Sequence, residues 1–395
     1  MGDSGYDKLL DRIDEREVVQ LLSELMRFQT VNPPGNERGM AEYSARWLAD
    51  AGLEVEVLNH DQERASLIAR LKGSGEVPAV AYTGHLDVVP LGEAQWSHDP
   101  FGGKVSEGKV WGRGATDMKS GDAVMMIVAK MLAAAKVPLK GDLILALTAG
   151  EEVDFLGSRA IADGWHWGPA QIVFMLEPSG NEVVVAEKGI LWLEITTYGK
   201  TAHISQIEQG RNAIMMMLPI LTELDKMPVE YAEHPLLGGF ARSINTVHAG
   251  AKTNTIPDRC VATVDMRSVP GQEHDKIVAQ VEKLIADVGQ RCALPDFNAS
   301  VKVIHNGPPL ANRPQDETVK RFCDIVAEVT GKQPQPIGAG GATDAIAFVP
   351  RLQAPFCMCG PGTPKMIHQT DEYVEIPMLV DSTRIYLLTA LRFLT

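Results

Sequence analysis

Two adjacent glutamates, Glu151 and Glu152, raise the question of what chemistry this chain carries. They follow the apolar run 144–147 and the tripeptide Thr148-Ala149-Gly150. Neighbouring carboxylates repel each other, and the end of a buried strand solvates them poorly. Such a pair therefore needs either exposure to solvent or cations close to it.

Polar residues of the same kind follow another apolar run. His85 and Asp87 lie just past it in VAYTGHLDVVP. One residue separates them, so both side chains point the same way in an extended chain. A carboxylate beside the second ring nitrogen is the usual support of a metal-binding histidine. The alternative is a structural histidine in a capped turn.

Three further residues complete the set, and each has an ordinary alternative explanation. Asp117 stands in a glycine-rich loop just before a predicted helix, where it could be a helix cap. Glu177 lies one step beyond an apolar strand and could be a solvated loop residue. His368, in PGTPKMIHQTDEY, could be a surface histidine.

The elements that must position these residues alternate along the chain. The patterns predict helices over 7–29, 37–52, 120–136 and 376–394, and strands over 53–60, 65–73, 77–85, 141–148 and 171–176. This alternation predicts an α/β fold, with a largely parallel sheet and helices on both faces. The carboxyl ends of such strands meet at one edge, where ligands bind. Two histidines and four acids gathered there could hold two divalent ions that deprotonate a water.

The order of the predicted strands and helices changes after residue 188. Strands are predicted over 188–200, 242–250, 257–267 and 298–304, and helices over 209–226 and 272–288. This β-α-β-β-α-β order is typical of a ferredoxin-like unit. We therefore expect an inserted domain at 189–304 between two parts of a larger domain, 1–188 and 305–395.

The amino-acid composition disfavours some classes of binding partner. The net charge of −14 over 395 residues argues against nucleic acid and anionic membranes. No apolar run approaches the ~20 residues of a membrane-spanning helix. The polar, acidic N-terminus is not a secretory signal, and five scattered cysteines indicate reduced thiols. Cys357 and Cys359 are expected to be buried thiols, and the protein is expected to be cytoplasmic.

Five motifs occur together: GHLDVVP, GRGATDMKSG, TAGEEVDFLGS, LEPSG and TNTIPDRC. With them the chain resembles, over nearly its whole length, a family of co-catalytic zinc amidohydrolases. That family contains acetylornithine deacetylase, succinyl-diaminopimelate desuccinylase, aminoacylase and carboxypeptidase G. The resemblance implies a zinc-exopeptidase-like mixed sheet flanked by helices, with an inserted α+β ferredoxin-like lid and dimerisation domain.

The resemblance also implies a role for each site residue. The metal ligands would be His85, Asp117, Glu152, Glu177 and His368. Asp117 would bridge two ions, with His85 and Glu177 on the first and the other two on the second. Asp87 would orient His85, and Glu151 would be the general base. Family members also often have a cis peptide after the bridging aspartate. Zinc fits this donor set, as cobalt or manganese would.

In the inserted domain, His203 of GKTAHIS matches a histidine that reaches the partner subunit's active site and stabilises the oxyanion. Asn254 and Arg267 match residues that bind the substrate carboxylate or carbonyl. The alternatives are a turn histidine for His203 and a surface ion pair for Arg267. The resemblance thus implies a homodimer.

Three positions refine the expectation about which substrate the protein would accept. Ile204 follows His203 where the family has glycine or alanine, and its bulk would reshape the pocket. Ile346 stands where desuccinylases place an arginine, which disfavours succinyl-diaminopimelate. Glu177 in place of aspartate weakly favours acyl-amino-acid hydrolases.

We therefore expect hydrolysis of the amide of an N-acyl amino acid or dipeptide-like substrate with a free carboxylate. Two alternatives stay open. One is a relative that cleaves an unusual C–N bond, such as an aryl amide or aromatic amine. The other is a catalytically inactive metal-binding scaffold.

Overall fold

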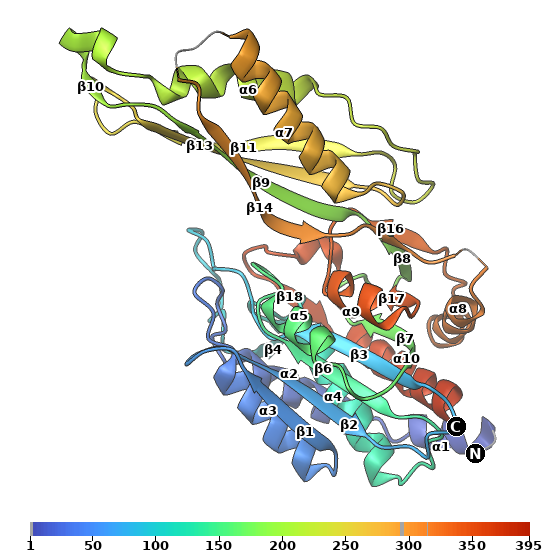
Figure 1. Cartoon of the computed structure of the whole chain (residues 1–395). Helices are drawn as coiled ribbons and strands as arrows, with labels where there is room; N and C mark the ends of the chain where they lie inside the picture. Colours follow the sequence, from blue (N-terminus) through green and yellow to red (C-terminus); the bar gives the residue numbers. More distant parts are fainter. Residues whose placement is uncertain (1–2, 293–295, 314) are drawn as a thin grey trace. The chain divides into compact units, whose positions relative to one another are not determined.

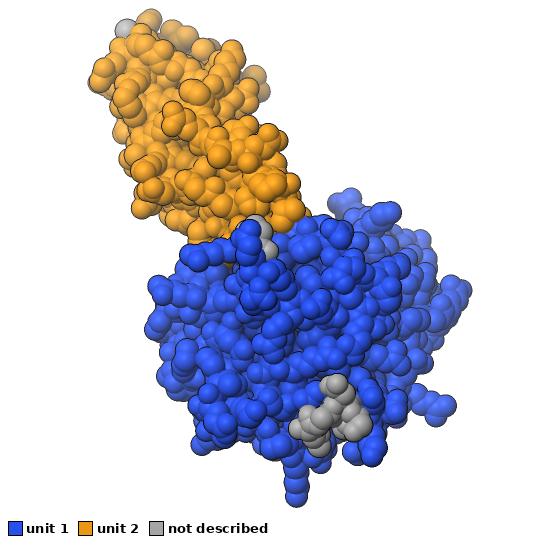
Figure 2. Space-filling view, turned by 90° about the vertical axis from the view of Figure 1, so that its right-hand side faces the viewer, with its two compact units in different colours: residues 1–185, 312–337, 343–395 blue, residues 186–311, 338–342 orange. Residues whose placement is uncertain are grey.

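The computed structural model describes residues 3–292, 296–313 and 315–395, and the chain divides into two compact units. The first comprises residues 1–185, 312–337 and 343–395, and the second residues 186–311 and 338–342. Figure 1 shows the elements and Figure 2 the two units. The mixed α/β class that the sequence predicts is confirmed.

The first unit is built on a mixed sheet in the order β1-β2-β6-β3-β7-β17-β8. The strands are β1 (Glu54–Asn59), β2 (Ala65–Leu71), β3 (Ala79–His85), β6 (Leu143–Thr148), β7 (Ala170–Met175), β8 (Val184–Glu187) and β17 (Phe356–Met358). The centre, β6-β3-β7-β17, is parallel. The edges are antiparallel because β2 returns beside β1 in a hairpin, and β8 runs against β17. The expectation of a largely parallel sheet therefore holds only for the centre.

Helices of the first unit bury an apolar core against this sheet. They are α1 (Asp3–Leu10), α2 (Glu15–Met26), α3 (Arg38–Asp50), α4 (Lys119–Ala134), α5 (Leu156–Asp163), α8 (Glu317–Thr330), α9 (Ala345–Leu352) and α10 (Ile376–Leu394). Every residue of β3 and β6 is buried, as expected for strands covered on both faces. α4 packs against α2, α10, β3 and β6, and its first turn lies directly after Asp117.

The single helix predicted over 7–29 is wrong, because the structure has two helices there. Asp14 stands between α1 and α2, and its carboxylate accepts a hydrogen bond from the N–H of Arg16. A side chain that caps a new helix competes with continuation of the preceding one.

A small sheet joins distant parts of the first unit. Its strands are β4 (Lys104–Ser106), β5 (Lys109–Trp111) and β18 (Tyr373–Glu375), in the order β18-β5-β4. A short 3₁₀ helix, η2 (Pro364–Met366), precedes β18. Because β18 pairs with β5, the segment before β18 is brought beside the loop that follows β5.

The second unit contains a four-stranded antiparallel sheet in the order β11-β13-β9-β14. Its elements are β9 (Gly189–Tyr198), α6 (Ala213–Lys226), β11 (Ala241–Ala249), β13 (Arg259–Ser268), α7 (His274–Arg291) and β14 (Ala299–Gly307). Alternate residues of β13 (Cys260, Ala262, Val264 and Met266) are buried in a core with α6 and α7. The predicted ferredoxin-like order is confirmed.

Short elements that the sequence patterns do not predict complete the second unit. β10 (Ala202–His203) and β12 (Thr255–Ile256) form a two-stranded ribbon, and η1 (Ile204–Gln209) follows β10. β8 crosses from the first unit into the second after Val185, and β15 (Leu310–Ala311) pairs with its last two residues, Ala186 and Glu187. β16 (Ile337–Ala339) also pairs with β8.

Two remaining expectations concern membranes and thiols. Within the described ranges, no helix combines the length and apolar character needed to cross a bilayer. Cys357 and Cys359 are buried free thiols, as expected.

Candidate metal centre

The parallel centre of the sheet brings three of the predicted segments to one edge. β3 ends at His85 and β6 at Thr148, just before the adjacent glutamates, and β7 ends two residues before Glu177. These three strands are neighbours in the order β6-β3-β7, so their carboxyl ends lie together. Asp117 joins them from the loop before α4, and His368 from the segment before β18. All these residues belong to the first unit.

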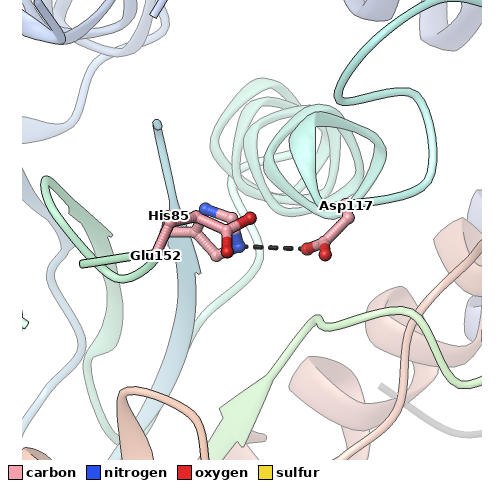
Figure 3. A group of neighbouring side chains, drawn as sticks. All are labelled: His85, Asp117 and Glu152. Carbon is pink, nitrogen blue, oxygen red and sulfur yellow. Dashed lines mark hydrogen bonds and ion pairs between the residues drawn. The ribbon is translucent and has the colours of Figure 1, made fainter. Parts of the chain in front are cut away.

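The carboxylate of Asp117 lies between two groups of side chains. Its Oδ1 is 3.1 Å from Nε2 of His85, which in turn is 3.7 Å from Oε2 of Glu177. Its Oδ2 is 3.3 Å from Nε2 of His368, which is 3.2 Å from Oε1 of Glu152. Figure 3 shows His85 facing Asp117, with Glu152 beside them. Each oxygen of one carboxylate thus meets a different histidine-glutamate pair.

Asp87 holds the turn that carries the adjacent glutamates. Its carboxylate is fully buried and accepts hydrogen bonds of 3.0–3.2 Å from the backbone N–H groups of residues 150–152. A fourth hydrogen bond, of 2.9 Å, comes from Nδ2 of Asn32. Nδ1 of His85 lies 2.9 Å from the backbone oxygen of Asp87 and 3.6 Å from its carboxylate. Asp87 therefore contacts both His85 and the backbone of the glutamate turn.

The crowding of acids changes the proton affinity of the whole cluster. Burial lowers the pKa of His85, but Glu177 and the hydrogen bond with Asp117 outweigh it and raise this pKa well above its usual range. Burial, with its acidic neighbours, raises the pKa of Glu151 well above its usual range. Hydrogen bonds to Asp117 and to its glutamate partner raise the pKa of His368 to about 10. For these three groups the shifts favour the protonated forms, which carry less negative charge into the cluster.

The donor atoms suit divalent ions. One ligand atom each from His85, Asp117 and Glu152 lies within 4.8 Å of the others. Imidazole nitrogen with carboxylate oxygen is a donor set for zinc, and also for cobalt or manganese. Cations between these groups would replace the protons that the cluster otherwise takes up. The residues present therefore fit the metal centre that the sequence predicts.

The peptide bond between Asp117 and Met118 is cis, as the sequence resemblance led us to expect.

The remaining predicted site residues lie in the second unit. His203 is exposed, and the backbone N–H of Ser205 donates a 3.2 Å hydrogen bond to its Nδ1. The amide of Asn254, directly before β12, contacts Nε2 of the same ring at 3.4 Å. Arg267 lies on β13 and forms a two-point ion pair with Asp265, at 2.9 and 3.0 Å. The structure thus brings His203 and Asn254 together, whereas Arg267 is paired with Asp265.

The comparisons with known proteins agree with this site. The model of peptidase family M20/M25/M40 matches residues 81–392, more than half of the chain. The succinyl-diaminopimelate desuccinylase of Cereibacter sphaeroides is 30% identical over 389 residues, covering 93% of this chain and 96% of that protein.

This chain belongs to peptidase family M20.

Solved structures show that the fold is that of M20 peptidases. An M20 family metallo-carboxypeptidase from Sulfolobus solfataricus superimposes with a TM-score of 0.80 at 19% identity, covering 96% of this chain and all of that one. A dinuclear metal-binding M20 peptidase from Bacillus subtilis gives 0.68 at 19% identity, with 96% and 98% covered. The chain is thus a metal-dependent hydrolase of amide or peptide bonds.

Sequence reasoning missed three buried residues around the centre of this M20 peptidase. Asn32 binds Asp87, and Arg113 pairs with Glu372 beside Asp117. Asn32 precedes two prolines and a glycine, and Arg113 lies inside the motif GRGATDMKSG. These signals mark an irregular backbone but do not reveal which side chain each residue contacts.

The two isoleucines singled out in the sequence have different environments. Ile346 is buried in the first turn of α9, with 5% of its surface exposed. Ile204 begins η1 in the second unit and is 52% exposed. Ile346 therefore belongs to the packing of its helix, whereas Ile204 is accessible.

Proposed function

We propose that this M20 peptidase cleaves the amide bond of an N-acyl amino acid or dipeptide-like substrate with a free carboxylate. Two divalent ions would be held on either side of Asp117. The observation that carries the proposal is the division of this carboxylate between His85 and His368. The structurally similar Bacillus subtilis protein is described as a dinuclear metal-binding peptidase, which supports two ions rather than one.

The assignment of ligands follows the two groups. His85 and Glu177 would bind the first ion, His368 and Glu152 the second, and Asp117 both. When bound, the ions would polarise the scissile carbonyl and lower the pKa of a water between them. Zinc is the proposed metal, because imidazole and carboxylate ligands together are its usual set.

Glu151 would be the general base. Its backbone N–H is tied to Asp87, as is that of Glu152, so the turn is held at both residues. The side chain of Glu152 contacts His368, which leaves the carboxylate of Glu151 available for proton transfer. It would take a proton from the attacking water and pass it to the leaving nitrogen. The two adjacent glutamates would thus have different roles, Glu152 in metal binding and Glu151 in proton transfer.

The second unit would act as lid and dimerisation domain, and His203 would donate to the developing oxyanion. The backbone N–H of Ser205 donates to Nδ1 of His203, so Nε2 is the ring nitrogen that would donate to the oxyanion once substrate displaces the Nδ2 of Asn254 from it. A donor at this atom is what an oxyanion requires. Asn254, in contact with Nε2, would bind the same carbonyl region.

Arg267 would bind the substrate carboxylate. Its pair with Asp265 uses Nε and Nη2, so Nη1 is the nitrogen that would meet the substrate. Arginine binds carboxylates with well-defined geometry, which makes it suitable for selecting free acids.

The homodimer would form through the second unit. β11 is an edge strand of its sheet, and β11 and α6 expose Val247, Met215 and Leu218 by 50% or more. Unpaired strand edges with apolar neighbours are suited to pairing with another chain. A histidine carried by this unit could then act in the partner's site.

A substrate panel tests the proposal. Purified protein loaded with zinc, cobalt or manganese would be given N-acetyl and N-succinyl amino acids, dipeptides, their carboxyl-amidated forms and an aryl amide. We expect turnover of free acids that is lost with a chelator and restored by metal. The family resemblance places an arginine of desuccinylases at Ile346, so we expect N-acetyl substrates to be turned over faster than N-succinyl ones. Turnover of the aryl amide alone would overturn the proposal.

A further inference from the structure

A buried ion pair joins two of the loops that carry the proposed metal ligands. Nη1 of Arg113 lies 2.6 Å from Oε2 of Glu372, and their side chains are 2% and 0% exposed. Arg113 precedes Asp117 in the loop after β5, and Glu372 follows His368 in the segment before β18. The pair thus connects the loop of the proposed bridging ligand to the loop of a proposed ligand of the second ion.

Glu372 holds the backbone of the Asp117 loop with its other oxygen. Oε1 accepts hydrogen bonds from the N–H groups of Gly114 at 3.1 Å, Thr116 at 2.8 Å and Asp117 itself at 3.0 Å. Three donors on one carboxylate oxygen leave this loop little freedom to rotate. The backbone of the bridging aspartate is therefore set by a residue 255 positions away in the chain.

Arg113 holds the His368 segment in the same way. Its guanidinium donates to the carbonyl oxygens of Gln369 at 3.2 Å and His368 at 3.4 Å, and to that of Pro90 at 3.2 Å. Pro90 lies three residues after Asp87, so the loop that follows His85 and Asp87 is contacted as well. The ring of Trp96 lies 5.1 Å from the guanidinium carbon. A planar group with several donors can bind these separate carbonyls at once, as a lysine could not.

The contrast between the two histidines explains why such an anchor is needed. His85 is 1% exposed and is held by the packing around β3. The side chain of His368 is 46% exposed, and its backbone has a positive φ of 62°. Packing therefore cannot fix its position, and backbone contacts such as those of Arg113 must do so. Burying two charges is costly unless hydrogen bonds satisfy them. Both oxygens of Glu372 and both Nη atoms of Arg113 are hydrogen-bonded, whereas Nε of Arg113 is buried without a partner among the described residues.

We propose that Arg113 and Glu372 are positioning residues that set the separation of Asp117 and His368, and thereby the affinity of the second metal site. The proposal rests on the ligand assignment of the proposed function. The pair binds the backbone of two ligands of the second ion, Asp117 and His368, but of only one ligand of the first, Asp117, because its contact at Pro90 lies five residues after His85. Disturbing the pair should therefore release the second ion first.

Two variants test this inference. Glu372→Gln keeps an acceptor for the three N–H groups but places an amide beside Arg113. Arg113→Lys keeps the charge but cannot reach all the carbonyls. The matched control is Glu328→Gln, in an exposed pair with Arg392 at 2.7 Å. Metal content would be measured by elemental mass spectrometry across a chelator series, together with kcat, KM and the metal-induced rise in Tm.

For both variants we expect one metal equivalent to leave at about 10- to 100-fold lower chelator concentration than in the wild type, as for other residues that support ligands. kcat should fall with KM little changed, and the metal-induced rise in Tm should shrink. The control should match the wild type. Should Glu372→Gln not fold, Arg113→Lys alone decides.

A purely structural pair would behave differently. Tm would then fall equally with and without metal, while metal affinity and kcat stayed at wild-type values, and this result would overturn the inference. Failure of the proposed function has another signature, because the wild-type protein itself would then not bind two equivalents of metal.

Discussion

The metal centre of the first unit and the β10–β12 ribbon of the second are built in opposite ways. At the centre, His85, Asp87 and Asp117 are buried, and each is held by several partners from distant parts of the chain. On the ribbon, His203 is exposed, and its contacts are with Ser205 in its own turn and with Asn254 directly before the paired strand β12. Metal ligands need a geometry set before the ion arrives, whereas a group that meets a substrate must stay accessible. The difference predicts how each region responds to substitution.

The largest effect should come from the adjacent glutamates. Glu151→Gln should lower kcat by about 10²- to 10⁴-fold, as for removal of a general base, with both metals retained. Glu152→Gln should lose metal, because its carboxylate is paired with His368. Elemental analysis of both proteins checks this. Equal depletion of metal in the two variants would show that Glu151 is also a ligand.

Removal of His203 should affect catalysis but not metal. His203→Ala is expected to lower kcat by about 10²- to 10³-fold, as for loss of one oxyanion donor. Metal content should be unchanged, since the residue lies on the ribbon.

Mixing subunits sharpens this prediction. If His203 acts across a dimer, Glu151→Gln and His203→Ala proteins should regain activity after subunit exchange, because one site of each mixed dimer is intact. Sedimentation would establish that dimers form. Exchange without recovery would mean that His203 acts within its own chain or not at all.

Arg267→Ala should have a smaller effect that depends on the substrate. A hydrogen bond to a charged group is worth about 1.5–3 kcal/mol, so kcat/KM for free acids should fall by about 10- to 150-fold. Carboxyl-amidated substrates serve as the control and should lose little. The same loss with both kinds of substrate would indicate that Arg267 serves the structure through its pair with Asp265.

Asn32→Ala should give the smallest effect, and this effect should be a loss of metal affinity. Asn32 is buried and supplies one of four hydrogen bonds to Asp87, so metal affinity should drop by about tenfold. Asn212→Ala, which removes a helix cap in the second unit, is the matched control. It should lower stability by about 1 kcal/mol and leave metal binding unchanged. Equal metal affinity in the two variants would contradict a role for Asn32 at the centre.

Much of the fold follows from local patterns. The apolar runs that form β3 and β6, and the alternation along β13, are readable because burial on two faces or one face leaves a period in the sequence. The break between α1 and α2 was missed because Asp14 acts through one side-chain hydrogen bond. The direction of β2 was missed because strand pairing depends on partners remote in sequence.

For the candidate site, the sequence alone indicates which residues could bind metal, because strand ends in an α/β sheet share one edge and the motifs contain suitable donors. Only the tertiary structure decided how Asp117 divides its oxygens between His85 and His368. It also decided that Glu372 holds the Asp117 loop. These contacts join residues up to 255 positions apart, and no local periodicity records such a pairing, because a buried polar side chain is specified by the groups that surround it.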